Sequence, residues 1–212
     1  MVKAEIAPFM MRKLLLPWIF FLSCHSDTVR QIQQSDIIAI APLNHPKTAS
    51  VSELKDNIEK FYGCKVILLP NQSIPSSAFY KKRARYRADS LLIFLETVKP
   101  DSVDFILGLT DSDISATVSN YKDWGVFGYG QCPGVSNVIS TFRLKKNADQ
   151  AKISTRLKNV AIHEIGHNYG LPHCGDTTCI MKDAHGKLSS IEGKSRYLCG
   201  KCQKRIQYQS PR

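Results

Sequence analysis

The amino-acid sequence predicts an α/β fold in which at least some strands are parallel. Short apolar runs alternate along the chain with longer stretches of helical periodicity, which is the pattern of consecutive strand–helix–strand units. The 212 residues suffice for one domain with a sizeable core, or for one domain and a small lobe. Apolar residues make up 43% and charged residues 22% of the chain, which excludes collagen, coiled coil and wholesale disorder.

Five short apolar segments are expected to form strands: residues 37–40, 66–69, 103–109, 125–130 and 136–142. The first two are closed by Pro42 and Pro70, which lack the N–H that a strand ladder uses. The last two are expected to pair around a loop that contains Cys132, Pro133 and Gly134.

Three segments have the periodicity of helices. The first begins at a capping box formed by Ser50 and Glu53 and ends at Gly63. The second covers residues 78–98 and the third covers residues 147–169. Their apolar stripes consist of Ala88, Leu91, Leu92 and Leu95 in the second, and of Ile153, Leu157, Val160 and Ala161 in the third.

A basic run lies in the second expected helix. It consists of Lys81, Lys82, Arg83, Arg85 and Arg87. The whole chain has 29 Lys and Arg against 18 Asp and Glu, and its formal net charge of +11 suits an acidic partner or surface. Such a run is more often the solvated face of a helix, so nucleic-acid binding is the less favoured interpretation.

The N-terminus has the features of an export signal. Arg12 and Lys13 precede a nine-residue apolar run, residues 14–22, and Ser23 and Cys24 follow it. A cysteine directly after a small residue resembles a bacterial lipobox, in which the cysteine is lipidated and becomes the new N-terminus. We therefore expect an exported lipoprotein of a bacterial cell envelope, attached to the membrane through Cys24.

The alternative is a cytoplasmic protein whose apolar run is a buried first strand or helix. Pro17 inside the run weakens this alternative. Phe21 and Glu5 both depart from the usual signal pattern, and translation starting at Met10 or Met11 would remove Glu5.

A histidine motif in the third expected helix indicates a catalytic metal site. His163 and His167 lie about 40° apart on one helix face, so both imidazoles can reach one ion. Gly170 suits a left-handed cap, after which the chain turns and brings His173 back as a third ligand. Three neutral imidazoles leave a fourth zinc position open for water, and Glu164 suits the general base that deprotonates this water.

The motif continues into a cysteine pattern, and the whole run resembles the archaemetzincins, a family of metzincins. Cys174 directly follows the third histidine, and Cys179 comes after four further residues. Met181 lies two positions later, and seventeen residues separate it from the pair formed by Cys199 and Cys202. Every position of the family pattern is matched in this run.

The resemblance implies a metzincin-like three-layer α/β sandwich with a long active-site helix and a small zinc-bound C-terminal lobe. It implies a peptidase that acts on peptides or proteins and binds two zinc ions, one catalytic and one structural. By this resemblance the catalytic zinc is held by His163, His167 and His173, and Glu164 is the base. Met181 forms the turn beneath the site. The ligands of the structural zinc are Cys174, Cys179, Cys199 and Cys202.

Two disulfides are the alternative to the second zinc, because export to an oxidising compartment favours them. We prefer zinc, since four thiolates in two pairs suit a closed tetrahedral site without an open position. The remaining Cys64 and Cys132 are each expected to be small buried hydrophobes.

The expected organisation has four parts: a signal peptide at residues 1–23, a tether at 24–35, an N-terminal subdomain with the catalytic zinc at 36–173, and a C-terminal subdomain with the Cys₄ zinc at 174–212. Residues 136–142 are expected to offer a strand edge to an extended substrate. A catalytically quiet zinc protein and a basic nucleic-acid-binding module are the alternative functions. The presence of Glu164 argues against the first, because a structural site has no use for a base.

Overall fold

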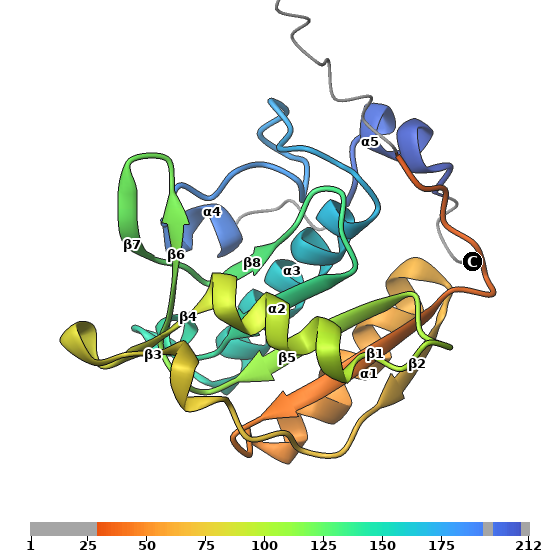
Figure 1. Cartoon of the computed structure of the whole chain (residues 1–212). Coiled ribbons are helices and arrows are strands. Elements are labelled where there is room, and N and C mark those ends of the chain that lie inside the picture. Colours follow the sequence, from red (N-terminus) through yellow and green to blue (C-terminus); the bar gives the residue numbers. More distant parts are fainter. Residues whose placement is uncertain (1–28, 193–196, 209–212) are drawn as a thin grey trace, which may run out of the picture.

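The computed structural model describes residues 29–192 and 197–208 and is built around a five-stranded sheet (Figure 1). The strands of this sheet are β1 (Ile37–Leu43), β2 (Lys65–Leu68), β5 (Phe105–Thr110), β8 (Gly128–Gly130) and β9 (Ser136–Ser140). Their spatial order is β2-β1-β5-β9-β8. All neighbours are parallel except β8, which pairs antiparallel with β9 and forms one edge.

Helices cover both faces of the sheet, which is therefore the middle layer of a three-layer sandwich (Figure 1). Alternate residues of β1 point to opposite faces, as the strand period requires. Ile38 and Ile40 pack in one core with helices α1 (Thr48–Tyr62) and α3 (Gln150–Asn168). Ala39 and Ala41 pack in a second core with helix α2 (Ala88–Val98). The expected α/β sandwich is confirmed.

A second, smaller sheet stands beside the first and was not expected from the sequence. Its order is β3-β4-β6-β7, and its strands are β3 (Phe79–Tyr80), β4 (Arg85–Arg87), β6 (Ile114–Val118) and β7 (Tyr121–Gly125). Strands β6 and β7 form a hairpin whose last register pair is Val118 and Tyr121. Ser119, between them, has a φ of 50°, the left-handed conformation that a two-residue hairpin turn needs.

The expected helix at residues 78–98 is wrong in its first half. The helix begins only at Ala88, and the preceding residues form short 3-10 turns and strands β3 and β4. Ala84 has a φ of 50°, which no α-helix tolerates. Tertiary pairing overrides local propensity here, because β4 pairs with β6 and its arginines meet carboxylates that are distant in sequence. The basic run is therefore not the face of a helix.

The other expected elements are confirmed with shifted boundaries. Helix α1 ends at Gly63, which is left-handed at a φ of 68°, but it begins at Thr48 without a side-chain cap, so the capping box was wrong. Strand β1 continues past Pro42, whose carbonyl accepts a hydrogen bond from the Gln72 N–H at 2.8 Å. Helix α3 is capped by Asp149, whose side chain accepts from the backbone N–H of Lys152.

The chain before and after the sandwich contacts α3 at different places. Residues 29–35, part of the expected tether, are docked through hydrogen bonds from Arg30 N to Tyr169 O and from Ile32 N to Ile206 O, each 3.0 Å. The C-terminal lobe contains helices α4 (Leu188–Glu192) and α5 (Gly200–Ile206). The N-terminal segment lies beside the end of α3 that carries the histidine motif, whereas α4 packs on the first half of this helix.

Two expectations concern residues outside the described ranges. The signal peptide at residues 1–23 and the lipidation candidate Cys24 both lie there. Among the helices that the structure describes, none has the length and apolar character needed to cross a bilayer.

Candidate active site

The last turns of α3 bring the first two histidines of the motif together. His163 and His167 are one helical turn apart, and their Nε2 atoms lie 3.0 Å from each other. Glycine then ends the helix, because Gly170 has a φ of 88°, as the sequence predicted. The turn returns His173 to the pair, with ring centroids 5.3 Å from His163 and 4.9 Å from His167.

Backbone carbonyls orient the half-buried imidazole of His163 and the buried imidazole of His167. His163 donates from Nδ1 to the carbonyl of Ile180 at 2.8 Å, and His167 donates from Nδ1 to the carbonyl of Leu171 at 2.7 Å. A carbonyl only accepts, so each proton is on Nδ1 and each Nε2 presents a lone pair to the other. Burial lowers the pKa of His163 to about 4 and that of His167 to about 3, which keeps both rings neutral.

Two lone pairs that face each other without a proton between them fit a shared cation. One nitrogen from each of the three histidines can lie within 4.8 Å of the others. In tetrahedral zinc coordination, nitrogen ligands are separated by about 3.3 Å, close to the 3.0 Å between the Nε2 atoms of His163 and His167. The third ring is held differently, since Nδ1 of His173 lies 3.5 Å from the Asp183 carboxylate. This donor set fits zinc.

Glu164 lies beside this group in a space that two glycines leave open. A Cβ at Gly128 would come within 2.6 Å of Oε1 of Glu164, and a Cβ at Gly130 within 3.3 Å of its Oε2. Both glycines are on β8, so the edge of the sheet packs directly on the carboxyl group. Burial, aided by the charge of Asp183, raises the pKa of Glu164 to about 8.

Met181 packs beneath the histidines where α3 has no side chain. A Cβ at Gly166 would lie 2.5 Å from Sδ of Met181, so the thioether occupies the place that any other residue would fill. The methionine is fully buried. Its neighbour Ile180 supplies the carbonyl that orients His163, so this turn and the helix hold one another in place.

Four cysteines form a second cluster in the C-terminal lobe: Cys174, Cys179, Cys199 and Cys202. Two of their Sγ–Sγ distances are 3.7 Å, against about 2.05 Å in a disulfide and about 3.8 Å between two thiolates on tetrahedral zinc. Burial and the nearby sulfur of Cys179 raise the pKa of Cys202, so four thiolates together require a cation. The geometry fits a metal and does not fit the alternative of two disulfides.

A cleft of about 550 Å³ opens over the histidines and Glu164. Strand β8 lines it, as do the β6–β7 hairpin and the loop after Met181. The expectation that residues 136–142 offer a free edge was wrong, because β9 lies between β5 and β8 and is paired on both sides. The edge strand at the cleft is β8. The hairpin is the part of the site that the sequence analysis missed.

The two remaining described cysteines behave differently from each other. Cys64 is buried in the core, as expected, and burial raises the pKa of its thiol to about 12. Cys132 was expected to be buried but is exposed, and its thiol donates to the carbonyl of Leu171 at 3.3 Å. They form no disulfide with each other.

The sandwich and the His₃ site with its adjacent glutamate together define a zinc metallopeptidase of metzincin type. Comparison with known families gives the more particular assignment. The model of peptidase family M54 matches residues 46–208. The chain therefore belongs to peptidase family M54, the archaemetzincins.

Curated relatives are similar along most of their length. An archaemetzincin of Haloquadratum walsbyi is 29% identical over 174 residues, which cover 78% of this chain and 96% of the relative. An archaemetzincin of Methanocaldococcus jannaschii is 32% identical over 178 residues, covering 80% and 92%. The matches therefore span nearly the whole of each relative and about four fifths of this chain.

Solved structures agree with the fold described above. Archaemetzincin from Archaeoglobus fulgidus, solved in complex with malonate, superposes with a TM-score of 0.69 at 29% identity and covers 80% of this chain and 99% of its own. Archaemetzincin from Methanopyrus kandleri gives a TM-score of 0.69 at 28% identity, with coverages of 82% and 94%.

The contact between Gly166 and Met181 yields a testable prediction. We expect Gly166→Ala to lower the free energy of unfolding by about 1–3 kcal/mol, because the new methyl group would overlap Met181. In an ordinary helix position the same change is stabilising by about 1 kcal/mol, so the sign itself is informative. Urea unfolding of the variant measures the effect. Gly175→Ala is the control, since nothing lies within 4 Å of its added Cβ; equal stability of both variants would contradict the packing described.

Proposed function

We propose that this chain hydrolyses peptide bonds with a zinc ion held by His163, His167 and His173 and with Glu164 as general base. The observation that supports the proposal most is the orientation of the His163 and His167 rings. Their Nδ1 protons are used by backbone carbonyls, so their Nε2 lone pairs converge next to a buried carboxyl group. A protein that only stores zinc needs no such carboxyl group.

When bound, zinc supplies a Lewis acid that polarises the scissile carbonyl and acidifies a water molecule. Glu164 accepts the proton that the attacking water loses and delivers it to the leaving amine. Burial raises the pKa of Glu164, and the positive charge of a bound zinc ion would favour the ionised carboxylate that accepts this proton. Gly128 and Gly130 keep the carboxyl group dry without displacing it.

The free edge of β8 is the proposed docking site for the substrate backbone. An extended peptide can add to an exposed sheet edge through main-chain hydrogen bonds. Strand β8 has β9 on one side only, and all three of its residues line the cleft. A peptide paired there would run directly past Glu164, which packs on the glycines of the same strand.

The four cysteines are proposed to hold a second, structural zinc. Their Sγ separations match tetrahedral coordination, and the Cys199 N–H donates to Sγ of Cys179 at 3.3 Å, as it would to a thiolate. Cys174 follows the third histidine directly, and its N–H donates to the carbonyl of Met181 at 2.8 Å. This second site would therefore stabilise the Met181 turn.

We propose that the enzyme is exported and attached to a membrane by lipidation of Cys24. Both steps are inferred from the basic and apolar segments of the first 23 residues and from the cysteine that follows them. The chain would then act at the surface of a membrane, connected to it through the part of the expected tether that precedes the docked residues 29–35.

The role of Glu164 predicts a separation of metal binding from activity. We expect Glu164→Gln to retain the bound metal and the fold but to lose peptide hydrolysis by two orders of magnitude or more, on the order of a general-base contribution. Metal analysis, circular dichroism and digestion of a broad peptide set measure the three properties. Glu53→Gln, on the surface of α1, is the matched control. Undiminished hydrolysis would remove Glu164 from the mechanism, and an inactive wild-type protein would favour the quiet zinc protein.

The two metal sites are expected to lose zinc separately. The histidine site opens on the cleft, whereas a Cys₄ site is closed and can contribute about 10–16 kcal/mol of apparent binding energy to folding. Mild chelation should abolish activity and leave one zinc and the fold. Cys202→Ser should instead disrupt the C-terminal lobe, while Cys132→Ser, outside the cluster, should not. One zinc per chain with four oxidised cysteines would show that the second site does not exist.

If the protein is a lipoprotein, the Sγ atom of Cys24 determines its attachment to the membrane. Cys24→Ala should abolish lipid labelling and release the protein from membranes, because the thiol is the proposed attachment point. Metabolic labelling and membrane fractionation measure both effects, with Cys132→Ala as the control. An unprocessed N-terminus in the mass spectrum of the wild-type protein would contradict the proposal.

A further inference from the structure

The β6–β7 hairpin forms a wall of the active-site cleft. Val118, Tyr121 and Trp124 all line the cleft, although they are distant in sequence from the histidine motif. Tyr121 is 63% exposed and Trp124 is 41% exposed, and their rings lie 5.3 Å apart. A β-bulge between Ala116 and Val118 lets both rings share one side of the hairpin.

Trp124 also meets the opposite side of the cleft. Its ring atoms lie 3.6 Å from the position that a Cβ of Gly186 would take. Gly186 has a φ of 70° and belongs to the loop that follows Met181, which also lines the cleft. The indole therefore spans from the hairpin to the loop next to the metal ligands, at a place where the loop has only backbone.

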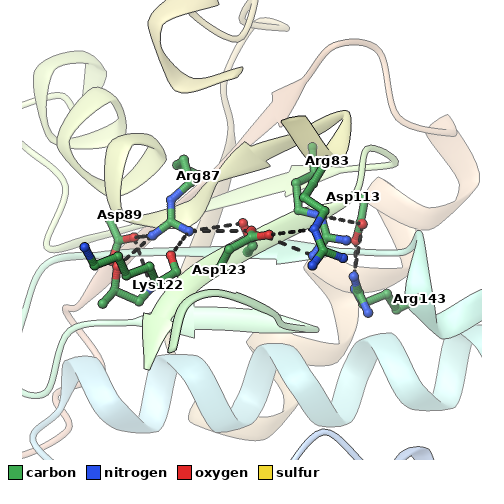
Figure 2. A network of polar contacts seen from close by, with 10 residues as sticks. Arg83, Arg87, Asp89, Asp113, Lys122, Asp123 and Arg143 are labelled. Carbon is green, nitrogen blue, oxygen red and sulfur yellow. Dashed lines mark hydrogen bonds and ion pairs between the residues drawn. The ribbon is translucent and has the colours of Figure 1, made fainter. Parts of the chain in front are cut away.

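The other side of the hairpin is held by a network of arginines and aspartates (Figure 2). Asp123, on β7, lies 3.7 Å from Arg83, 3.8 Å from Arg85 and 3.7 Å from Arg87. Both of its carboxylate oxygens are buried and have no hydrogen-bond partner closer than these ion pairs. The carboxylate is therefore held by charge alone, between three guanidinium groups.

Two arginines also contact the backbone of the hairpin (Figure 2). Arg87 donates to the carbonyl of Lys122 and, at 2.7 Å, to the hydroxyl of Thr117. Arg143 lies over Gly125, where any Cβ would overlap its guanidinium, and pairs with both oxygens of Asp113 at 2.7 and 3.0 Å. Such bidentate pairs fix orientation as well as distance.

We propose that Tyr121 and Trp124 are specificity-determining residues that select substrates with a large apolar side chain, and that Asp123 is the positioning residue that holds them over the cleft. The inference rests on the proposed peptidase function and adds a substrate class to it. Exposed aromatic rings at the mouth of a cleft gain free energy by covering an apolar group, and polar or small groups give them little. The network behind them removes the freedom that an isolated hairpin would have.

The first test measures the preference for a side chain. Peptides that differ in one residue, Phe, Leu, Ala or Asp, scanned along both sides of the cleaved bond, are compared by kcat/KM. The wild-type enzyme should prefer Phe and Leu over Ala at one position by on the order of tenfold. Trp124→Ala and Tyr121→Ala should each abolish most of this preference. Phe79→Ala, which removes a ring of 44% exposure from the same small sheet outside the cleft, should retain it.

The second test measures binding without hydrolysis. The chain has two tryptophans, and Trp18 lies in the expected signal peptide, so Trp18→Phe in the unprocessed chain leaves Trp124 as the only source of indole fluorescence. Titration of the chelated full-length protein with the Phe peptide should shift the Trp124 emission at concentrations on the order of tenfold below those that the Ala peptide requires. If this shift occurs and no peptide is cleaved, the inference stands and the peptidase proposal fails. Hydrolysis without any difference between the two peptides overturns the inference alone.

The third test separates positioning from stability. Asp123→Asn should shift the Trp124 emission to longer wavelength in the free protein and raise KM for Phe peptides on the order of tenfold, with kcat nearly unchanged. Asp123→Glu should restore part of both properties, because it returns the charge. Unchanged emission and KM in a folded Asp123→Asn variant would show that the network does not position the rings. If Asp123→Asn does not fold, the Trp124→Ala variant still tests whether the aromatic rings select the substrate side chain.

Discussion

The site depends on two hydrogen bonds from imidazole rings to backbone carbonyls. His163 and His167 use their Nδ1 protons on Ile180 and Leu171, and this alone determines which ring nitrogens face the metal position. Because the acceptors are main-chain atoms, they are placed by the path of the chain after α3. This segment starts at the left-handed Gly170 and returns to the helix at Met181, which packs on Gly166. The sandwich must therefore hold both the helix and the returning chain.

The sandwich holds α3 by packing it on the sheet and by hydrogen bonds between this helix and segments that are distant in sequence. Tyr62 of α1 donates to the carbonyl of Ile162 at 2.6 Å, one residue before the first ligand. Arg156 is fully buried and donates to the carbonyls of Leu144 and Lys146 and to Glu192. A buried guanidinium with these partners fixes the start of α3 and the end of α4 together. Chemistry is thus placed on a rigid element, while the proposed recognition residues lie on an exposed hairpin.

Charge in this chain serves structure as well as solubility. The basic run suggested a helix face, yet Arg83, Arg85 and Arg87 are engaged by aspartates of the small sheet and its neighbours. Partly buried ion pairs of this kind are screened less by salt than exposed ones. The formal net charge of +11 already subtracts these aspartates, so the pairs do not explain the excess. They show only that Arg83, Arg85 and Arg87 are not a free cationic surface for nucleic acid.

The sequence by itself determined the α/β class, the long helix with its capping glycine and the histidine group, because these depend on short-range spacing. His163 and His167 share a face by helical geometry, and Gly170 turns the chain. The group of four cysteines was expected from the resemblance of its spacing to the archaemetzincins, and the structure brings the four together. Only the tertiary structure decided that residues 79–87 are strands and turns, that β8 rather than β9 is the edge, and that a hairpin forms a wall of the cleft. These features arise from strand pairing and ion pairs between residues far apart in the chain, such as Arg87 and Asp123. Local propensity contains no information about such partners.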